Sequence, residues 1–166
     1  MPFKSDKQRQ TVMAMLLQTK FGQQAMKQKK LTLFHGTTDE RAPKIAKHGL
    51  RSFKKRDYVS VTPMPHDAFD FVNTFRDDEL FGEGDAQVFA VKVKPSTLRR
   101  SSATHFPDYY KEERQAKVPS FRGDLYVKPP RWEFSAGYKV PKKDVYLIPQ
   151  KLLAKMLKVK YKFRDY

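Results

Sequence analysis

The sequence contains no cysteine. A disulfide framework, a thiolate metal site and a thiol nucleophile are therefore excluded, and the composition is compatible with a reducing compartment. No apolar run approaches the length needed to span a bilayer. Residues 1–10 also lack the apolar segment of a secretory signal. We therefore expect a cytoplasmic protein without a membrane span.

Several motifs for metal and nucleotide binding are missing as well. The chain has no HExxH motif, no Gly-rich P-loop and no GxGxxG turn. His48, His66 and His105 show no metal-ligand spacing with one another, so we expect no metal site. His66 with Asp67 fits the start of a helix instead.

Basic residues are in large excess. Lys and Arg number 34 against 18 Asp and Glu, which gives a formal net charge of +16. A field of this sign attracts polyanions, so nucleic acid is the first candidate partner and an anionic membrane surface the second. A soluble surface with one sign in excess is the open alternative. Hydrophobic residues at 39% and aromatic residues at 13% indicate a folded domain.

Hydrophobic spacing predicts the order of secondary structure. The first half should contain a helix over 5–30 broken at Gly22, and a strand over 31–35 ending in a His35-Gly36-Thr37 turn. A helix over 39–48 should then face inward through Ile45 and Ala46. The remaining predicted elements are a strand over 58–62, a helix over 66–75, a strand over 87–94, a short helix near 108–116, strands over 124–128, 131–136 and 144–148, and a helix over 150–158.

This order is not a regular alternation of strand and helix, so we expect an α+β fold and not a doubly wound parallel sheet. We divide the chain into a basic helical appendage (1–30), a core (31–149) and a C-terminal basic helix and tail (150–166).

Three segments of the core together resemble the ADP-ribosyltransferase superfamily. They are LFHGTTDERAPKIAKHGL (33–50), YVSVTPMPHDAFDFV (58–72) and RWEFSAGYKVPKKDVYLIP (131–149). The resemblance rests on their order and spacing, since the third segment is weak alone. It implies a split antiparallel or mixed β-sheet core that binds NAD without a GxGxxG turn.

The resemblance assigns the first NAD contacts to His35, Gly36 and Thr37. Gly36 has no Cβ, so its backbone N–H and C=O would approach and pair with the nicotinamide carboxamide. His35 would hydrogen-bond a ribose hydroxyl, and Thr37 would add a polar contact. A strand-terminating His-Gly turn without a ligand is the alternative interpretation.

The second segment supplies the next candidates. Ser60 and Thr62 share one face of their strand because side chains alternate. Ser60 is the best match to the Tyr or Ser that the family carries there, which gives a His-Ser-Glu set. Phe71 is the first candidate to cover the nicotinamide ring, with Phe69 and Tyr58 behind it. A core position is the alternative for Phe71.

Glu133 is the candidate catalytic carboxylate. Cleavage of the nicotinamide–ribose bond develops positive charge on the sugar, which a nearby carboxylate stabilises. Glu133 would also orient or deprotonate the acceptor. A strand-edge salt bridge is its alternative role. Glu112 and Glu113 are rivals, although their surroundings are typical of a solvated helix.

A further set of basic residues is a candidate nucleic-acid contact, because cations can bind phosphates while neighbouring rings stack on unpaired bases. The set comprises Arg51, Lys54, Lys55, Arg56 and Arg131. The same mixture of basic and aromatic residues also occurs on ordinary surfaces.

Together these features predict a mono-ADP-ribosyltransferase that uses NAD to modify a macromolecule, either a nucleic acid or a protein bound to one. Two alternatives stay open. One is an NAD-dependent RNA 2′-phosphotransferase, whose pocket needs several Arg residues, for which only Arg51 and Arg131 are candidates. The other is a non-catalytic nucleic-acid-binding or virion-associated protein with a degenerate fold.

Overall fold

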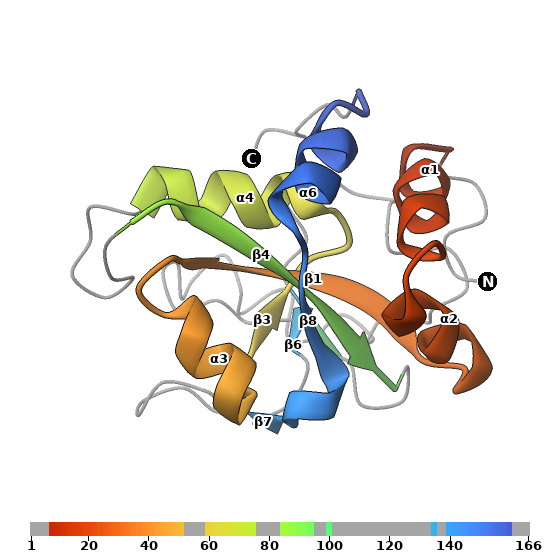
Figure 1. The fold of residues 1–166 in the computed structure, drawn as a ribbon, viewed down its shortest axis with the longest axis horizontal. Helices are drawn as coiled ribbons and strands as arrows, with labels where there is room; N and C mark the ends of the chain where they lie inside the picture. Colours follow the sequence, from red (N-terminus) through yellow and green to blue (C-terminus); the bar gives the residue numbers. More distant parts are fainter. Residues whose placement is uncertain are drawn as a thin grey trace.

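The computed structural model has an α+β fold (Figure 1). It describes residues 7–51, 59–75, 84–94, 99–100, 134–135 and 139–160. The α-helices among them are α1 (Lys7–Leu16), α2 (Lys20–Lys27), α3 (Ala42–His48), α4 (Pro65–Phe75) and α6 (Gln150–Leu157). The strands are β1 (Leu31–Thr38), β2 (Leu50–Arg51), β3 (Ser60–Val61), β4 (Ala86–Val93), β5 (Arg99–Arg100), β6 (Phe134–Ser135), β7 (Lys139–Val140) and β8 (Val145–Leu147), with a 3₁₀ helix η3 (Lys142–Asp144) before β8.

The described strands form three antiparallel sheets, in the orders β1-β4-β8, β2-β7 and β3-β6-β5. β1 pairs with β4 along its whole length, from Leu31 opposite Val93 to Thr38 opposite Ala86. Figure 1 shows α4 and α6 on one side of this central sheet and α3 on the other. The central sheet therefore has both faces covered.

Each face of the central sheet contributes to its own apolar core, since successive side chains point to opposite faces. We call the two sides the helical face and the α3 face. On the helical face the core comprises Val12, Leu16, Phe21, Phe34, Met64, Ala68, Val88, Ala90, Ile148, Leu153 and Met156. On the α3 face it comprises Leu33, Ala42, Leu50, Val59, Val61, Phe89, Val91, Val93 and Val140.

The predicted first helix is two helices, but the break predicted at Gly22 is wrong. α1 ends at Leu16 and α2 begins at Lys20. The Thr19 hydroxyl accepts a hydrogen bond from the Gly22 N–H at 3.1 Å and so caps α2. Gly22 lies inside α2, where a Cβ would collide with the Leu16 carbonyl. This glycine permits close packing of the two helices instead of ending one.

The predicted turn at His35-Gly36-Thr37 is also wrong. β1 continues through these residues to Thr38, and the chain turns at 39–41. The reason is the long ladder with β4, which pairs His35 with Phe89 and Gly36 with Val88. The motif is therefore part of a paired strand.

Other sequence predictions agree in kind and differ in detail. α4, β4 and α6 lie where the apolar spacing predicted them, and Gly49 ends α3 with a φ of 79°. α3 begins only at Ala42. Ala42 is buried and Ala46 is exposed, so the inward prediction for Ala46 is wrong. The predicted helix near 108–116 and the strand over 124–128 lie outside the described residues.

The boundaries drawn at residues 30 and 149 stay predictions. Within the described residues, Leu16 of α1, Phe21 of α2 and Leu153 of α6 belong to the same apolar core as Phe34 of β1. The described part of the chain contains no helix with the length and apolar character needed to cross a membrane.

A buried arginine fastens α1 to the central sheet. Arg9 is 2% exposed. Its guanidinium donates to the Thr32 carbonyl at 2.6 Å and to the Pro63 carbonyl. These carbonyls belong to β1 and to the short link between β3 and α4. Arg9 therefore joins three segments that are distant in sequence.

Replacing Arg9 with Met retains much of the apolar volume but removes both hydrogen bonds. We expect the free energy of unfolding to fall by roughly 2–4 kcal/mol, because two buried carbonyls lose a charged donor. Urea denaturation measures the change. Exposed Lys7→Met is the matched control and should be near wild type. Equal stability of the two variants would contradict the role of Arg9.

His66 joins the start of α4 to the end of α6. Its side chain is buried, and Nε2 donates to the Val159 carbonyl at 2.8 Å. Burial lowers the pKa of His66 below its ordinary value, although hydrogen bonds to the backbone of Val159 and Leu157 oppose this shift. The charged form is therefore disfavoured in the folded state.

This lowered pKa predicts a loss of stability in acid. Between the folded pKa and the unfolded value of about 6.5, the unfolded chain binds more protons at this site, so the free energy of unfolding falls as pH falls. Thermal melts from about pH 7.5 to about pH 5 measure this. His66→Gln should flatten the decline relative to His48→Gln, which leaves His66 in place. An unchanged decline in His66→Gln would rule out this origin.

Candidate functional site

The three motif residues of β1 point to different sides of the central sheet. The side chains of His35 and Thr37 lie on the α3 face, because each shares its face with its partner on β4. His35 is half-buried and Thr37 is buried. Gly36, between them, directs its Cβ position to the helical face. A ligand that contacts His35 therefore approaches from the α3 face or the strand edge.

Gly36 is required by the packing of α4. A Cβ at this position would collide with the Ala68 carbonyl and lie 2.7 Å from Val72 Cγ2. Both residues belong to α4. The helix therefore lies directly against the strand backbone here, and no ligand can approach Gly36 from the helical face.

With the helical face covered by α4 and one edge paired with β4, the backbone of Gly36 is left with the edge that faces β3. Phe34 and Thr62 form a bridge, with reciprocal N–H to carbonyl distances of 2.8 Å. Among the described residues this is the single β-bridge between the two strands. The next pair in this register would be Gly36 with Ser60. No such pair occurs among the described residues, and Ser60 pairs with Ser135 of β6.

The direction of the Gly36 backbone follows from this bridge. Backbone groups alternate between the two edges of a strand. Since Phe34 directs its N–H and C=O towards β3, Gly36 does the same. One donor and one acceptor therefore face the separation of the strands, which is the complement of a primary carboxamide. We call this place, formed by Phe34–Gly36 and Ser60–Thr62, the β1–β3 divergence.

The candidate residues of the second segment lie at different distances from the β1–β3 divergence along their elements. Ser60 lies on β3 beside the divergence. Thr62 follows it, and its hydroxyl donates to the Met64 carbonyl at 2.9 Å, so it is already used in a local turn. Phe71 lies on α4 and is half-buried. Because α4 covers the helical face, Phe71 and the His35 side chain belong to opposite sides of the central sheet.

Several candidates lie outside the described residues. These are Glu133, Arg131, Lys54, Lys55 and Arg56, together with the rivals Glu112 and Glu113. The residues that follow Glu133 in the chain form β6, which pairs with β3 through Phe134 and Val61. No cluster of His, Asp or Glu within the described part of the chain could hold a metal ion.

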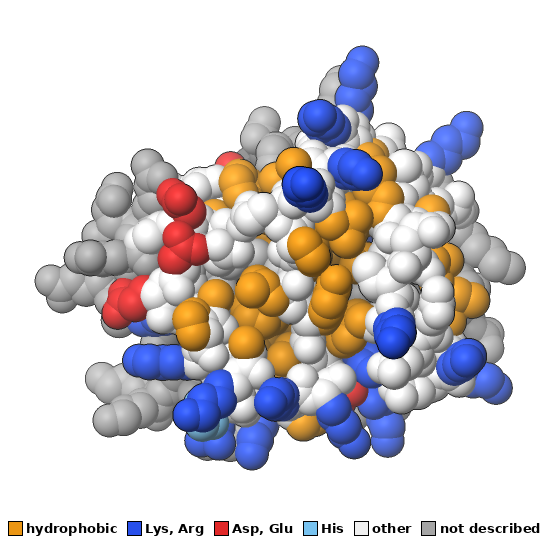
Figure 2. All heavy atoms as spheres, in the orientation of Figure 1, with side chains coloured by type: hydrophobic (Ala, Val, Ile, Leu, Met, Phe, Trp, Pro, Cys, Tyr) orange, Lys and Arg blue, Asp and Glu red, His pale blue; other side chains and the backbone are white. Residues whose placement is uncertain are grey.

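Arg51 is the described member of the predicted nucleic-acid set. It lies exposed on β2, directly opposite Lys139 of β7. Figure 2 shows Lys and Arg side chains along the lower rim of the molecule and also at its top and right, while most of the visible acidic side chains lie at the left. Lys139 was not among the sequence candidates, because its nearness to Arg51 depends on a pairing between distant segments.

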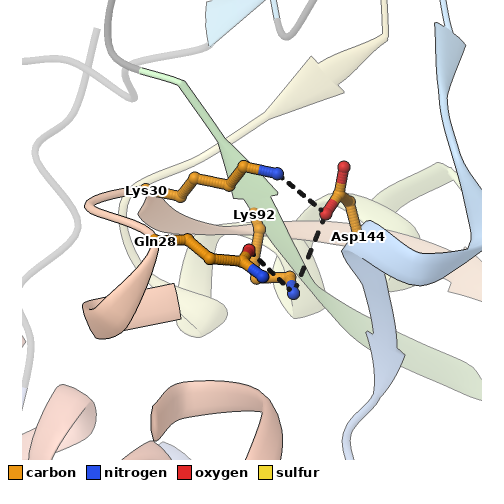
Figure 3. A network of polar contacts seen from close by, with 4 residues as sticks. All are labelled: Gln28, Lys30, Lys92 and Asp144. Carbon is orange, nitrogen blue, oxygen red and sulfur yellow. Dashed lines mark hydrogen bonds and ion pairs between the residues drawn. The ribbon is translucent and has the colours of Figure 1, made fainter. Parts of the chain in front are cut away.

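Sequence reasoning also missed a buried ionic network, drawn in Figure 3. Asp144 Oδ1 lies 3.2 Å from Lys30 Nζ and 3.8 Å from Lys92 Nζ. Lys92 also contacts Gln28 Oε1 at 3.4 Å and lies over the Phe21 ring. The signal was present, since a lysine stands at an inward position of a largely apolar strand. This network fixes η3 against β4 and β1.

Gly36→Ala tests whether α4 packs directly on β1. We expect the free energy of unfolding to fall by roughly 1–3 kcal/mol or more, because the new methyl group overfills the contact. Thermal or urea denaturation measures it. Val72→Ala alone and the double variant complete a mutant cycle, in which the combined loss should be smaller than the sum of the single losses. Full stability of Gly36→Ala would refute the contact.

Comparisons with known proteins do not assign the chain to a family. No protein-family model matches it, and no curated protein matches it significantly. The case for a function therefore depends on the β1–β3 divergence and on the motifs around it.

Proposed function

We propose that the protein is an NAD-dependent mono-ADP-ribosyltransferase with a split β-sheet core of the ADP-ribosyltransferase type. The observation that carries the proposal is the β1–β3 divergence. There, a strand bearing His35 and Gly36 separates from the strand bearing Ser60 after the Phe34–Thr62 bridge. NAD is a substrate in this proposal.

Recognition of nicotinamide follows from the backbone of Gly36. Its N–H donates to the carboxamide oxygen and its C=O accepts from the carboxamide NH₂. Because α4 blocks the other side of Gly36, the carboxamide enters in the plane of the sheet. His35 binds a ribose hydroxyl, and Thr37 and Ser60 supply further polar contacts. Thr62 contributes as an acceptor, since its hydroxyl proton is directed to Met64.

The ring contact is assigned to an aromatic side chain of the second segment. Phe71 is the first candidate, and it would have to reach the nicotinamide around the edge of β1 because α4 lies on the helical face. Phe69 and Tyr58 are the other candidates. Comparing alanine variants of the three by their effect on KM for NAD identifies the ring that stacks.

Catalysis is assigned to Glu133. The bond between the nicotinamide nitrogen and ribose C1′ breaks, nicotinamide leaves with the bonding electron pair, and an acceptor nucleophile forms the new bond at C1′. Glu133 stabilises the positive charge on the ribose and takes the proton of the acceptor. Its position in the chain supports this role, because β6 follows it directly and pairs with β3.

The acceptor is a macromolecule, either a nucleic acid or a protein bound to one. The net charge of +16 supports this class, because a basic surface concentrates polyanions near the site.

Glu133→Gln is the decisive substitution. It keeps the shape of the side chain and removes its charge, so we expect transfer of label from labelled NAD to DNA, RNA or protein acceptors to fall by roughly 100-fold or more. Melting temperatures establish that the variant is folded. Glu112→Gln, which removes the same charge elsewhere, should keep activity.

Two outcomes would refute the proposal. One is the absence of NAD turnover with every acceptor class, and the other is undiminished turnover in Glu133→Gln. Nicotinamide release that requires 2′-phosphorylated RNA would assign the RNA 2′-phosphotransferase reaction instead.

A further inference from the structure

Seven exposed basic side chains lie towards one end of the molecule, which we call the basic end. They come from α3, β2, β7 and η3, which lie together at the lower rim of Figures 1 and 2. The members are Lys44, Lys47, His48, Arg51, Lys139, Lys142 and Lys143.

The fold holds the basic end together through buried apolar residues beneath it. β2 and β7 pair through Leu50 and Val140, which are 3% and 4% exposed and belong to the core of the α3 face. Ala42 of α3 belongs to the same core, and α3 contacts η3. The basic side chains therefore belong to elements whose relative positions are held by apolar packing.

The arrangement is unfavourable in the isolated protein. Arg51 and Lys139 stand directly opposite each other on paired strands, and like charges in this position destabilise a sheet. Asp144 follows Lys143 in the chain, but the residue is 7% exposed and its carboxylate is turned inward to Lys30 and Lys92 (Figure 3). The nearest acid in sequence therefore does not neutralise the surface.

Acidic side chains lie elsewhere. Asp39 and Asp85 stand at the end of the β1–β4 ladder, where Asp39 accepts hydrogen bonds from the Asp85 N–H at 3.0 Å and from the Gln87 side chain. These hydrogen bonds connect the end of β1 with the start of β4. The exposed acids Asp39 and Asp85 thus lie outside the basic end, although exposed lysines also occur on other parts of the described surface.

We propose that the basic end binds the phosphodiester backbone of a nucleic acid without reading its bases. The role of the basic end as the docking surface for the acceptor rests on the proposed transferase function. Its ability to bind a nucleic acid rests on the charge distribution alone. A membrane fits less well, because peripheral sites add inserted apolar side chains to basic ones, whereas Leu50 and Val140 are buried here.

Binding of this kind has a measurable signature. Each lysine or arginine that meets a phosphate releases counterions, so affinity falls with salt by about 0.9 in log–log slope per contact on a duplex. Removing contacts therefore makes the slope shallower by a predictable amount. Uniform attraction by net charge would make the slope depend on total charge and not on position.

The test compares two variants of the full chain that lose the same charge. One carries Arg51→Gln, Lys139→Gln, Lys142→Gln and Lys143→Gln. Lys47 and His48 are left intact because they also complement the C-terminal end of α3. The control carries Lys7→Gln, Lys20→Gln, Lys151→Gln and Lys155→Gln, all exposed and outside the basic end.

Fluorescence anisotropy with a labelled DNA duplex of mixed sequence, without NAD, gives Kd across a salt series. We expect Kd of the first variant to rise by roughly 100-fold or more near 0.1 M salt, with a slope shallower by about one per lost contact. The control should remain within a few-fold of wild type. Equal weakening of both variants, no duplex binding by wild type, or tighter binding to anionic vesicles would overturn the proposal.

A single substitution distinguishes an effect on DNA binding from an effect on the stability of the fold. Lys139→Thr removes the like-charge pair and introduces a β-branched residue, so without DNA the melting temperature should rise by about 1–3 °C. Duplex affinity should nevertheless fall. A fall in both quantities would indicate a structural role for Lys139. Because these measurements omit NAD, an inactive enzyme that binds DNA refutes only the proposed function.

Discussion

The contact of α4 with the backbone of β1 at Gly36 is the constraint on which the rest of the structure depends. The chain leaves β3 at Val61, forms the Phe34–Thr62 bridge and enters α4 at Pro65. With so short a link, α4 must cross β1 close to the bridge. Only glycine leaves room for the Ala68 carbonyl at that crossing. Beyond the bridge, no further pair between β1 and β3 occurs among the described residues, and the Gly36 backbone faces this edge.

Arg9 of α1 reinforces this crossing of α4 over β1. Its donors bind Thr32 on β1 and Pro63 on the link to α4, beside the Phe34–Thr62 bridge. The N-terminal helices thus help to hold the strands in the position that creates the divergence. The Lys30–Asp144–Lys92 network provides a comparable constraint where η3 meets the central sheet. Buried charges with several partners fix segment positions that apolar packing alone leaves adjustable.

The sequence predicted elements whose signal is local and missed those that depend on distant partners. α4 and β4 follow from apolar spacing because each buries residues at its own period. The break at Gly22 and the turn at Gly36 were wrong for one shared reason. Glycine resembles a local stop signal, yet here it makes room for Leu16 in one case and for α4 in the other.

The candidate site was predictable in the same partial way. The motif singled out Gly36 and its neighbours, because this part of the resemblance depends on consecutive residues. The divergence itself was not predictable, since it depends on where a bridge forms between Phe34 and Thr62, which are distant in the chain. The basic end has the same origin. Its lysines are unremarkable in sequence, and only the pairing of β2 with β7 brings Arg51 opposite Lys139.

The divergence and the basic end share one apolar core, and this has a mechanical consequence. Val61 of β3 packs in the same cluster as Leu50 of β2 and Val140 of β7. A polyanion on the basic end would relieve the repulsion between Arg51 and Lys139 and so bind the folded state preferentially, which stabilises it by linkage. That stabilisation would act on the core that supports β3. An acceptor bound there would therefore strengthen the strand arrangement that we propose as the NAD site, without any change in its shape.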